Sequence, residues 1–243
     1  MTEMIGLFLF ATLIAGGGGI LFKFYILDKL RVRQLFEGLE HCGYRKITQE
    51  DVLRKANKYK LSQNQSNSSD EIIKIIGKQN KNGGSGYLCD VHRKTRGYAG
   101  ANRSTTHKYY TMLFENINLE INREIKIRKK LPKIAEHFLT MQASMQSDTG
   151  MEITEGLIKD FTDQFSITAK DHNKGITISP EVQKTLLKFI NQFPLNQKKG
   201  PITTVFHISS DGWSVVCNRV VNKPNLTQLL QLSDFLTSSL SNA

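Results

Sequence analysis

The feature that most constrains this chain is an uncharged apolar run near its N-terminus, Met4–Phe22. A helix over these nineteen residues, MIGLFLFATLIAGGGGILF, would be about 30 Å long, close to the thickness of a bilayer's hydrocarbon core. A cleaved signal peptide would begin with basic residues, but only Met1, Thr2 and Glu3 precede the run. We therefore expect residues 1–22 to form a transmembrane anchor.

The charges that flank the run predict its orientation. Glu3 is the only charged side chain before it, and four basic residues follow it: Lys23, Lys29, Arg31 and Arg33. Because basic flanks stay on the cytoplasmic side of a membrane, we predict a single-pass protein of the cell membrane with its N-terminus outside and its C-terminal domain in the cytoplasm. The lipid bilayer is then its first partner.

Small residues recur along one side of the anchor. Ala11, Ala15 and Gly19 are spaced four apart and share one helix face, a pattern that lets two membrane helices approach closely. This face is a candidate contact for a homodimer, and the favoured alternative is that small residues are merely tolerated there.

The next segments read as helices and then a linker. Residues 23–60 contain a helical apolar stripe that stops at Gly43 and a second helix predicted from Thr48, with Asp51 as a variant capping box. This basic juxtamembrane region carries ten Lys or Arg against five Asp or Glu. Residues 61–86 are polar or glycine-rich apart from Ile72–Ile76, and this composition predicts a linker.

Residues 87–243 read as a soluble α+β domain. Two β-rich runs, Tyr87–His92 and Thr106–Phe114, predict a hairpin with a loop of about thirteen residues. Further strands are expected at Ile117–Ile127 and Gln164–Lys170.

The C-terminal third contains clear signals for helix starts and for a turn. Ser179 and Pro180 predict a helix start, Asp211-Gly212 predicts a tight hairpin turn, and a last helix should open at Pro224. The order of strands and helices predicts a mixed antiparallel sheet with packed helices.

No residue pattern specifies a reaction. The chain has no P-loop, no Rossmann glycine pattern, no HExxH and no GxSxG, and it has three scattered cysteines with no metal-binding spacing, which fits a reducing compartment. We expect no catalytic residues, cofactor or metal. His92 and His107 are the weak metal candidates, because a hairpin centred near Ala99-Gly100 would bring them together.

Positive charge is densest from Arg93 to Lys133, where eleven Lys or Arg face three Glu. The predicted basic surface comprises Arg93, Lys94, Arg96, Arg103, Lys126, Arg128, Lys129 and Lys130. Interleaved tyrosines (Tyr98, Tyr109 and Tyr110) make single-stranded nucleic acid conceivable, but a membrane-tethered domain more simply presents such charge to an anionic leaflet. Nucleic acid is therefore the disfavoured partner.

Three stretches together are similar to a group of uncharacterised bacterial membrane proteins: YLCDVHRKTRGYAGANRSTTHKYYTMLF, FTDQFSITAKDHNKGITISPEVQKTLLKFI and HISSDGWSVVCNRVV. The resemblance covers about residues 87–240 and departs around 134–163. It implies one or two N-terminal spans followed by a soluble α+β domain, and it supplies no catalytic residues.

Three functions follow from these observations. The leading hypothesis is a membrane-anchored cytoplasmic interaction or assembly module, without catalytic activity, that binds a protein partner at the membrane. The first alternative is a membrane-tethered enzyme, hydrolase-like or metal-dependent, that uses the 93–106 hairpin loop. The second is a binder of anionic lipid or nucleic acid through the basic 93–133 face.

Overall fold

The computed structural model of the chain describes residues 28–60, 67–79, 84–99, 102–119, 124–130, 151–152, 156–169, 178–192 and 204–241. The expected anchor and its dimer face (Ala11, Ala15 and Gly19) lie outside these residues. Within the described ranges, no helix combines the length and the apolar character needed to cross a membrane.

One antiparallel sheet organises the described part of the chain, in the strand order β1-β2-β3-β4-β9-β8-β5-β7-β6. Its nine described strands are β1 (Arg45–Lys46), β2 (Ser68–Gln79), β3 (Ser85–Ala99), β4 (Asn102–Asn116), β5 (Ile125–Lys129), β6 (Met151–Glu152), β7 (Phe165–Ala169), β8 (Val205–Ser209) and β9 (Gly212–Asn218). The predicted α+β class is confirmed.

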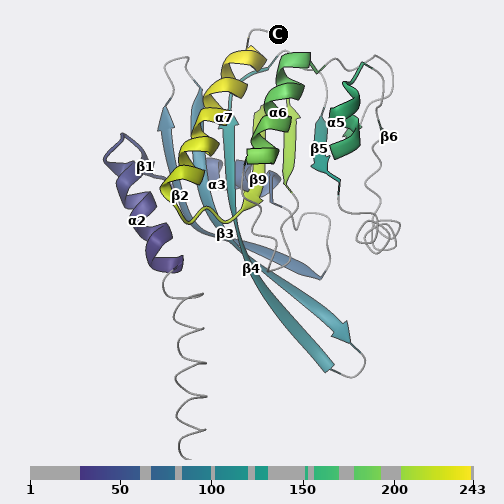
Figure 1. Cartoon of the computed structure of the whole chain (residues 1–243). Coiled ribbons are helices and arrows are strands. Elements are labelled where there is room, and N and C mark those ends of the chain that lie inside the picture. Colours follow the sequence, from purple (N-terminus) through teal and green to yellow (C-terminus); the bar gives the residue numbers. More distant parts are fainter. Residues whose placement is uncertain are drawn as a thin grey trace, which may run out of the picture.

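Helices cover both faces of this sheet (Figure 1). They are α2 (Asp28–Glu40), α3 (Glu50–Lys58), α5 (Lys159–Gln164), α6 (Pro180–Gln192) and α7 (Lys223–Ser241). The larger core joins α2, α5, α6 and α7 to one face, and a smaller core joins α3 to the other through Val52, Ala56 and Tyr59. β4 is buried on both faces from Tyr110 to Phe114 because it lies between these two cores.

Local sequence signals place the C-terminal helices and the last hairpin. The Val182 amide donates to Ser179 Oγ at 3.3 Å, as expected of an N-cap, and the Asn225 amide donates to Asn222 Oδ1 at 2.9 Å at the start of α7. The predicted tight turn joins β8 to β9, with Ser210 and Asp211 as its loop residues and Gly212 already in β9 opposite Ser209. The capping box at Thr48 is wrong, because α3 begins at Glu50 and its N-cap, Gln49, makes no side-chain bond.

The linker prediction for 61–86 is wrong for residues 68–79. These residues form β2, which pairs with β3 from Ser68 opposite Thr95 to Gln79 opposite Ser85. The polar half of β2 lacks the alternation of apolar and polar residues that predicts a strand. Its strand form therefore depends on pairing with β3. A register shift between Ile72 and Lys74 also breaks the periodicity.

Two further predictions are corrected. The thirteen-residue loop is wrong, because β3 and β4 remain paired until Ala99 faces Asn102. A continuous strand at Ile117–Ile127 is also wrong, because β5 starts only at Ile125. The amides of Ile117 and Leu119 instead donate to the carbonyls of Asp211 and Ser210 in the β8–β9 turn, at 3.3 and 2.9 Å.

Replacement of Gly212 by alanine should destabilise the fold far more than the same change at Gly43. Both glycines have positive φ, +89° at Gly43 and +132° at Gly212. A Cβ at Gly43 meets nothing within 4 Å, whereas one at Gly212 would lie 1.9 Å from the Glu115 carbonyl oxygen. We expect Gly43→Ala to cost about 1–2 kcal/mol and Gly212→Ala more than about 3 kcal/mol in chemical denaturation. Equal losses would contradict this register of β4 and β9.

Candidate functional site

The β3–β4 hairpin extends well beyond the strands that flank it. β9 pairs with β4 only from Tyr110 to Asn116, and β2 accompanies β3 in register only as far as Thr95. We call the outer part of the hairpin, residues 93–99 and 102–108, the arm; β2 still pairs with its first three residues, Arg93 to Thr95. Figure 1 shows the arm as a twisted ribbon that leaves the body of the sheet.

Four planar side chains stack at the base of the arm, and we call Arg219, Tyr109, His92 and His107 the ladder. The Arg219 guanidinium lies 4.4 Å from the Tyr109 ring centroid, and the Tyr109 and His92 centroids are 4.6 Å apart. His92 Nε2 lies 3.0 Å from His107 Nδ1. The predicted approach of the two histidines is therefore confirmed.

A buried ion pair fixes one end of the ladder. Arg219 Nε donates to Asp90 Oδ1 at 2.9 Å, and Nη2 donates to Oδ2 in the same fork. Asp90 is only 3% exposed. Burial raises the pKa of Asp90, and Arg219 opposes that rise. The pair crosses from β3 to the residue that follows β9, so the arm is held to the C-terminal half of the sheet.

The surroundings of His92 favour its neutral form. Burial lowers the pKa of His92 most, followed by His107 and Lys94, with a smaller contribution from Arg219, while Glu71 acts in the opposite direction. A hydrogen bond between two imidazoles requires at least one neutral acceptor nitrogen. The 3.0 Å contact between the two imidazoles and the lowered pKa of His92 therefore both fit a neutral His92 ring.

The predicted basic residues do not form one face. Lys94 and Arg96 are exposed on the arm, whereas Arg93 is only 9% exposed. The backbone of Arg103 lies opposite Tyr98 near the tip, and its side chain is outside the described part. The other four are half-buried on β5 or directly after it, and β9 and β8 separate that strand from β4; they are Lys126, Arg128, Lys129 and Lys130.

The tyrosines among these charges are not open stacking platforms. Tyr109 lies within the ladder between Arg219 and His92. Tyr110 is fully buried and donates to Asp70 Oδ2 at 3.0 Å. Nothing is described for the side chain of Tyr98.

A contact between a histidine and a carboxylate, His207 with Glu124, was not predicted. His207 Nε2 lies 2.6 Å from Glu124 Oε1, and the Tyr59 ring meets the His207 ring edge-on at 5.2 Å. Burial lowers the pKa of His207, while Glu124 raises it. The two residues are 83 positions apart, and only the pairing of β5 with β8 brings them together. Ser209, on the same strand, donates its hydroxyl to the Gly212 carbonyl at 3.4 Å. We interpret the His207–Glu124 pair as structural.

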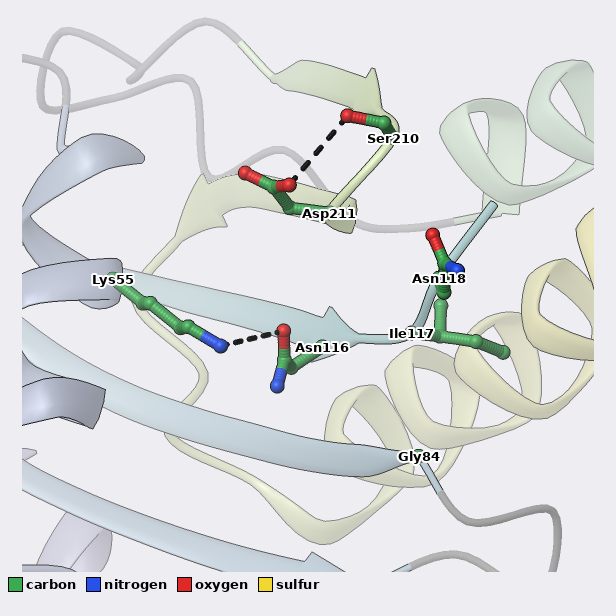
Figure 2. A pocket seen from close by; sticks show the side chains of 7 residues that line it. All are labelled: Lys55, Gly84, Asn116, Ile117, Asn118, Ser210 and Asp211. Atoms are coloured by element: carbon green, nitrogen blue, oxygen red, sulfur yellow. Dashed lines mark hydrogen bonds between the residues drawn. The ribbon is translucent and has the colours of Figure 1, made fainter. Parts of the chain in front are cut away.

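A polar surface depression of about 640 Å³ lies between α3, the end of β4 and the β8–β9 turn. Figure 2 shows Lys55 reaching Asn116, a contact of 3.0 Å, and Ser210 beside Asp211. Lys58 Nζ donates to Asp211 Oδ2 at 2.9 Å and lowers the pKa of that carboxyl group. These groups are engaged with one another, and the contact of a hydroxyl with a carboxylate among the lining residues, Ser210 Oγ to Asp211 Oδ1, is 3.5 Å long and shares Asp211 with Lys58.

The described residues contain no group of three or more His, Cys, Asp or Glu arranged to hold a metal ion. His92 and His107 therefore lack a third protein ligand within this part of the chain. Comparisons of the chain with family models, curated proteins and solved structures found no match. The resemblance to bacterial membrane-anchored proteins stays a prediction.

Removal of Arg219 should leave the carboxylate of Asp90 buried without its partner. We expect Arg219→Met to lower the free energy of unfolding by about 3–5 kcal/mol at neutral pH. The double variant Arg219→Met with Asp90→Leu should recover more than half of that loss, because no unpaired charge remains. Glu37→Ala, which breaks the exposed Arg33–Glu37 pair, is the control and should leave the denaturation midpoint unchanged. An undiminished loss in the double variant would refute this role of the pair.

The imidazole of His92 should titrate below the ordinary value of about 6.5 when followed by NMR of its ring protons. A lowered pKa means that the fold favours the neutral ring. The stability it contributes is present above pH 6.5 and is lost as the pH falls through the pKa of His92. His107→Ala should raise this pKa, whereas Lys184→Gln on α6 should not. A midpoint at or above 6.5 in the unaltered protein would contradict the ladder.

Proposed function

We propose that this chain is a membrane-anchored interaction module. In this proposal the run Met4–Phe22 crosses the cell membrane once, with the N-terminus outside, and holds the α+β domain on the cytoplasmic side. The domain acts by binding and not by catalysis, and the arm is its contact element. Two anchors that pack through Ala11, Ala15 and Gly19 would present two arms side by side.

The observation that carries the proposal is the arm itself. A β-hairpin that outruns its neighbours exposes polar and charged side chains without adding to the core, and stable folds gain little from such an extension. The ladder and the Asp90–Arg219 pair nevertheless hold its base in one geometry. Rigid support of an exposed element is typical of surfaces that bind.

The enzymatic alternative has less support. It relied on a hairpin loop at 93–106, and the described residues of that range, 93–99 and 102–106, pair as strands. In the polar depression, Lys55 contacts Asn116, and Asp211 accepts a hydrogen bond from Lys58. His92 and His107 bond to each other. Metal analysis of the purified protein, with His92→Ala and His107→Ala variants, separates the two functions.

The cysteines provide a direct test of the topology. Cys42 is exposed, while Cys89 and Cys217 are buried. Burial raises the pKa of both buried thiols, to about 12 for Cys217, so neither reacts readily at neutral pH. A maleimide that cannot cross membranes should therefore label Cys42 in inverted vesicles and leave it unlabelled in intact cells.

Cys42→Ser is the control and should abolish labelling in both preparations. Labelling in intact cells would place the domain outside the cytoplasm and overturn the orientation. Release of the chain from membranes by alkaline carbonate would overturn the anchor itself.

A further inference from the structure

The arm is one-sided in charge. Five Lys or Arg and no Asp or Glu occur between Arg93 and Lys108. Arg93 is buried, so the exposed charge described on the arm comes from Lys94 and Arg96. Because strand residues two apart point to the same face, these two side chains share a face with His92. Lys94 lies 3.8 Å from Glu71, and Arg96 forms no ion pair within the described part of the chain.

The arm points to the side of the molecule from which the chain enters. In Figure 1 the first turn of α2 and the tip of the arm both lie toward the lower side of the view, and the C-terminal end of α7 lies at the upper side. Asp28 follows Phe22 by six residues, which reach at most about 20 Å when extended. From Tyr110, the last residue of β4 that pairs with β9, to Asn102, β4 extends about 27 Å beyond the end of β9. The tip of the arm therefore extends toward the same side of the view as the start of α2.

The ladder argues against single-stranded nucleic acid as the occupant. Base stacking requires an open aromatic face. Tyr109 has Arg219 and His92 as ring neighbours, and Tyr110 is buried. The two tyrosines whose side chains the structure describes here, Tyr109 and Tyr110, thus give the charge no open aromatic platform, and this combination suits lipid headgroups.

We propose that the arm docks through Lys94 and Arg96 on the anionic headgroups of the leaflet in which the chain is anchored. This inference rests on the proposed function, because it requires the span Met4–Phe22. Each exposed basic residue raises the association constant for an anionic membrane about five-fold. Two such residues therefore bind a membrane only weakly by themselves. The anchor makes the contact intramolecular, so weak binding suffices to orient the domain.

The test uses the full chain in lipid nanodiscs, which leave both membrane sides open to solution. Thr105, exposed opposite Arg96, is changed to cysteine in a Cys42→Ser background and given a nitroxide label. In discs with about one third phosphatidylglycerol, accessibility to a water-soluble relaxation agent should fall at least about two-fold relative to pure phosphatidylcholine. Salt at about 0.5 M should remove the difference.

Lys94→Gln with Arg96→Gln should abolish the protection. The matched control, Lys184→Gln with Lys188→Gln on the exposed side of α6, removes the same charge and should retain it. Equal accessibility in both lipids, or protection that survives loss of Lys94 and Arg96, would overturn the inference. If a single-stranded oligonucleotide protects the label in phosphatidylcholine discs, the arm binds nucleic acid and the lipid inference is overturned.

Failure of the inference and failure of the proposed function are separate outcomes. If the chain stays embedded after alkaline carbonate but the label remains accessible, the anchor stands and the docking is refuted. If the chain does not embed in the membrane, the proposed function and the docking of the arm are both refuted.

Discussion

The pairing of β4 with β9 joins the N-terminal and C-terminal halves of the described sheet. On one side lie β1, β2, β3 and β4, and on the other lie β9, β8, β5, β7 and β6. The register runs from Tyr110 opposite Asn218 to Asn116 opposite Gly212. Each half alone would end in a long unpaired strand edge, a state that is prone to wrong pairing. The two cores on the faces of the sheet depend on this junction.

Buried polar contacts reinforce the same junction. The Val220 amide donates to Thr111 Oγ1 at 2.8 Å, and Ser233 Oγ donates to Glu115 Oε1 at 2.6 Å. With Asp90–Arg219 they tie β3 and β4 to residues that follow β9. A shift of one residue would send each polar group to the opposite face. These contacts therefore select one register, whatever their net contribution to stability.

The sequence predicted elements whose signals are local. The cap at Ser179, the Asp211-Gly212 turn and the start of the last helix near Pro224 depend on residues close in the chain. The failures depend on distant partners: β2 takes its strand form from β3, and Ile117 and Leu119 are diverted by the β8–β9 turn. Within the site, the hairpin centre was enough to place His92 near His107. The positions of Arg219 and of the His207–Glu124 pair required the strand order, which no local pattern encodes.

The ladder combines residues that are made at very different times during synthesis. His92, His107 and Tyr109 leave the ribosome early, and Arg219 follows Tyr109 by about 110 residues. At ordinary elongation rates this is a delay of roughly 5–20 s. Throughout that interval the nascent hairpin has neither β9 beside it nor a guanidinium for Asp90. The base of the arm therefore becomes rigid only after β9 and Arg219 have been made, and their synthesis sets the moment at which the surface is ready.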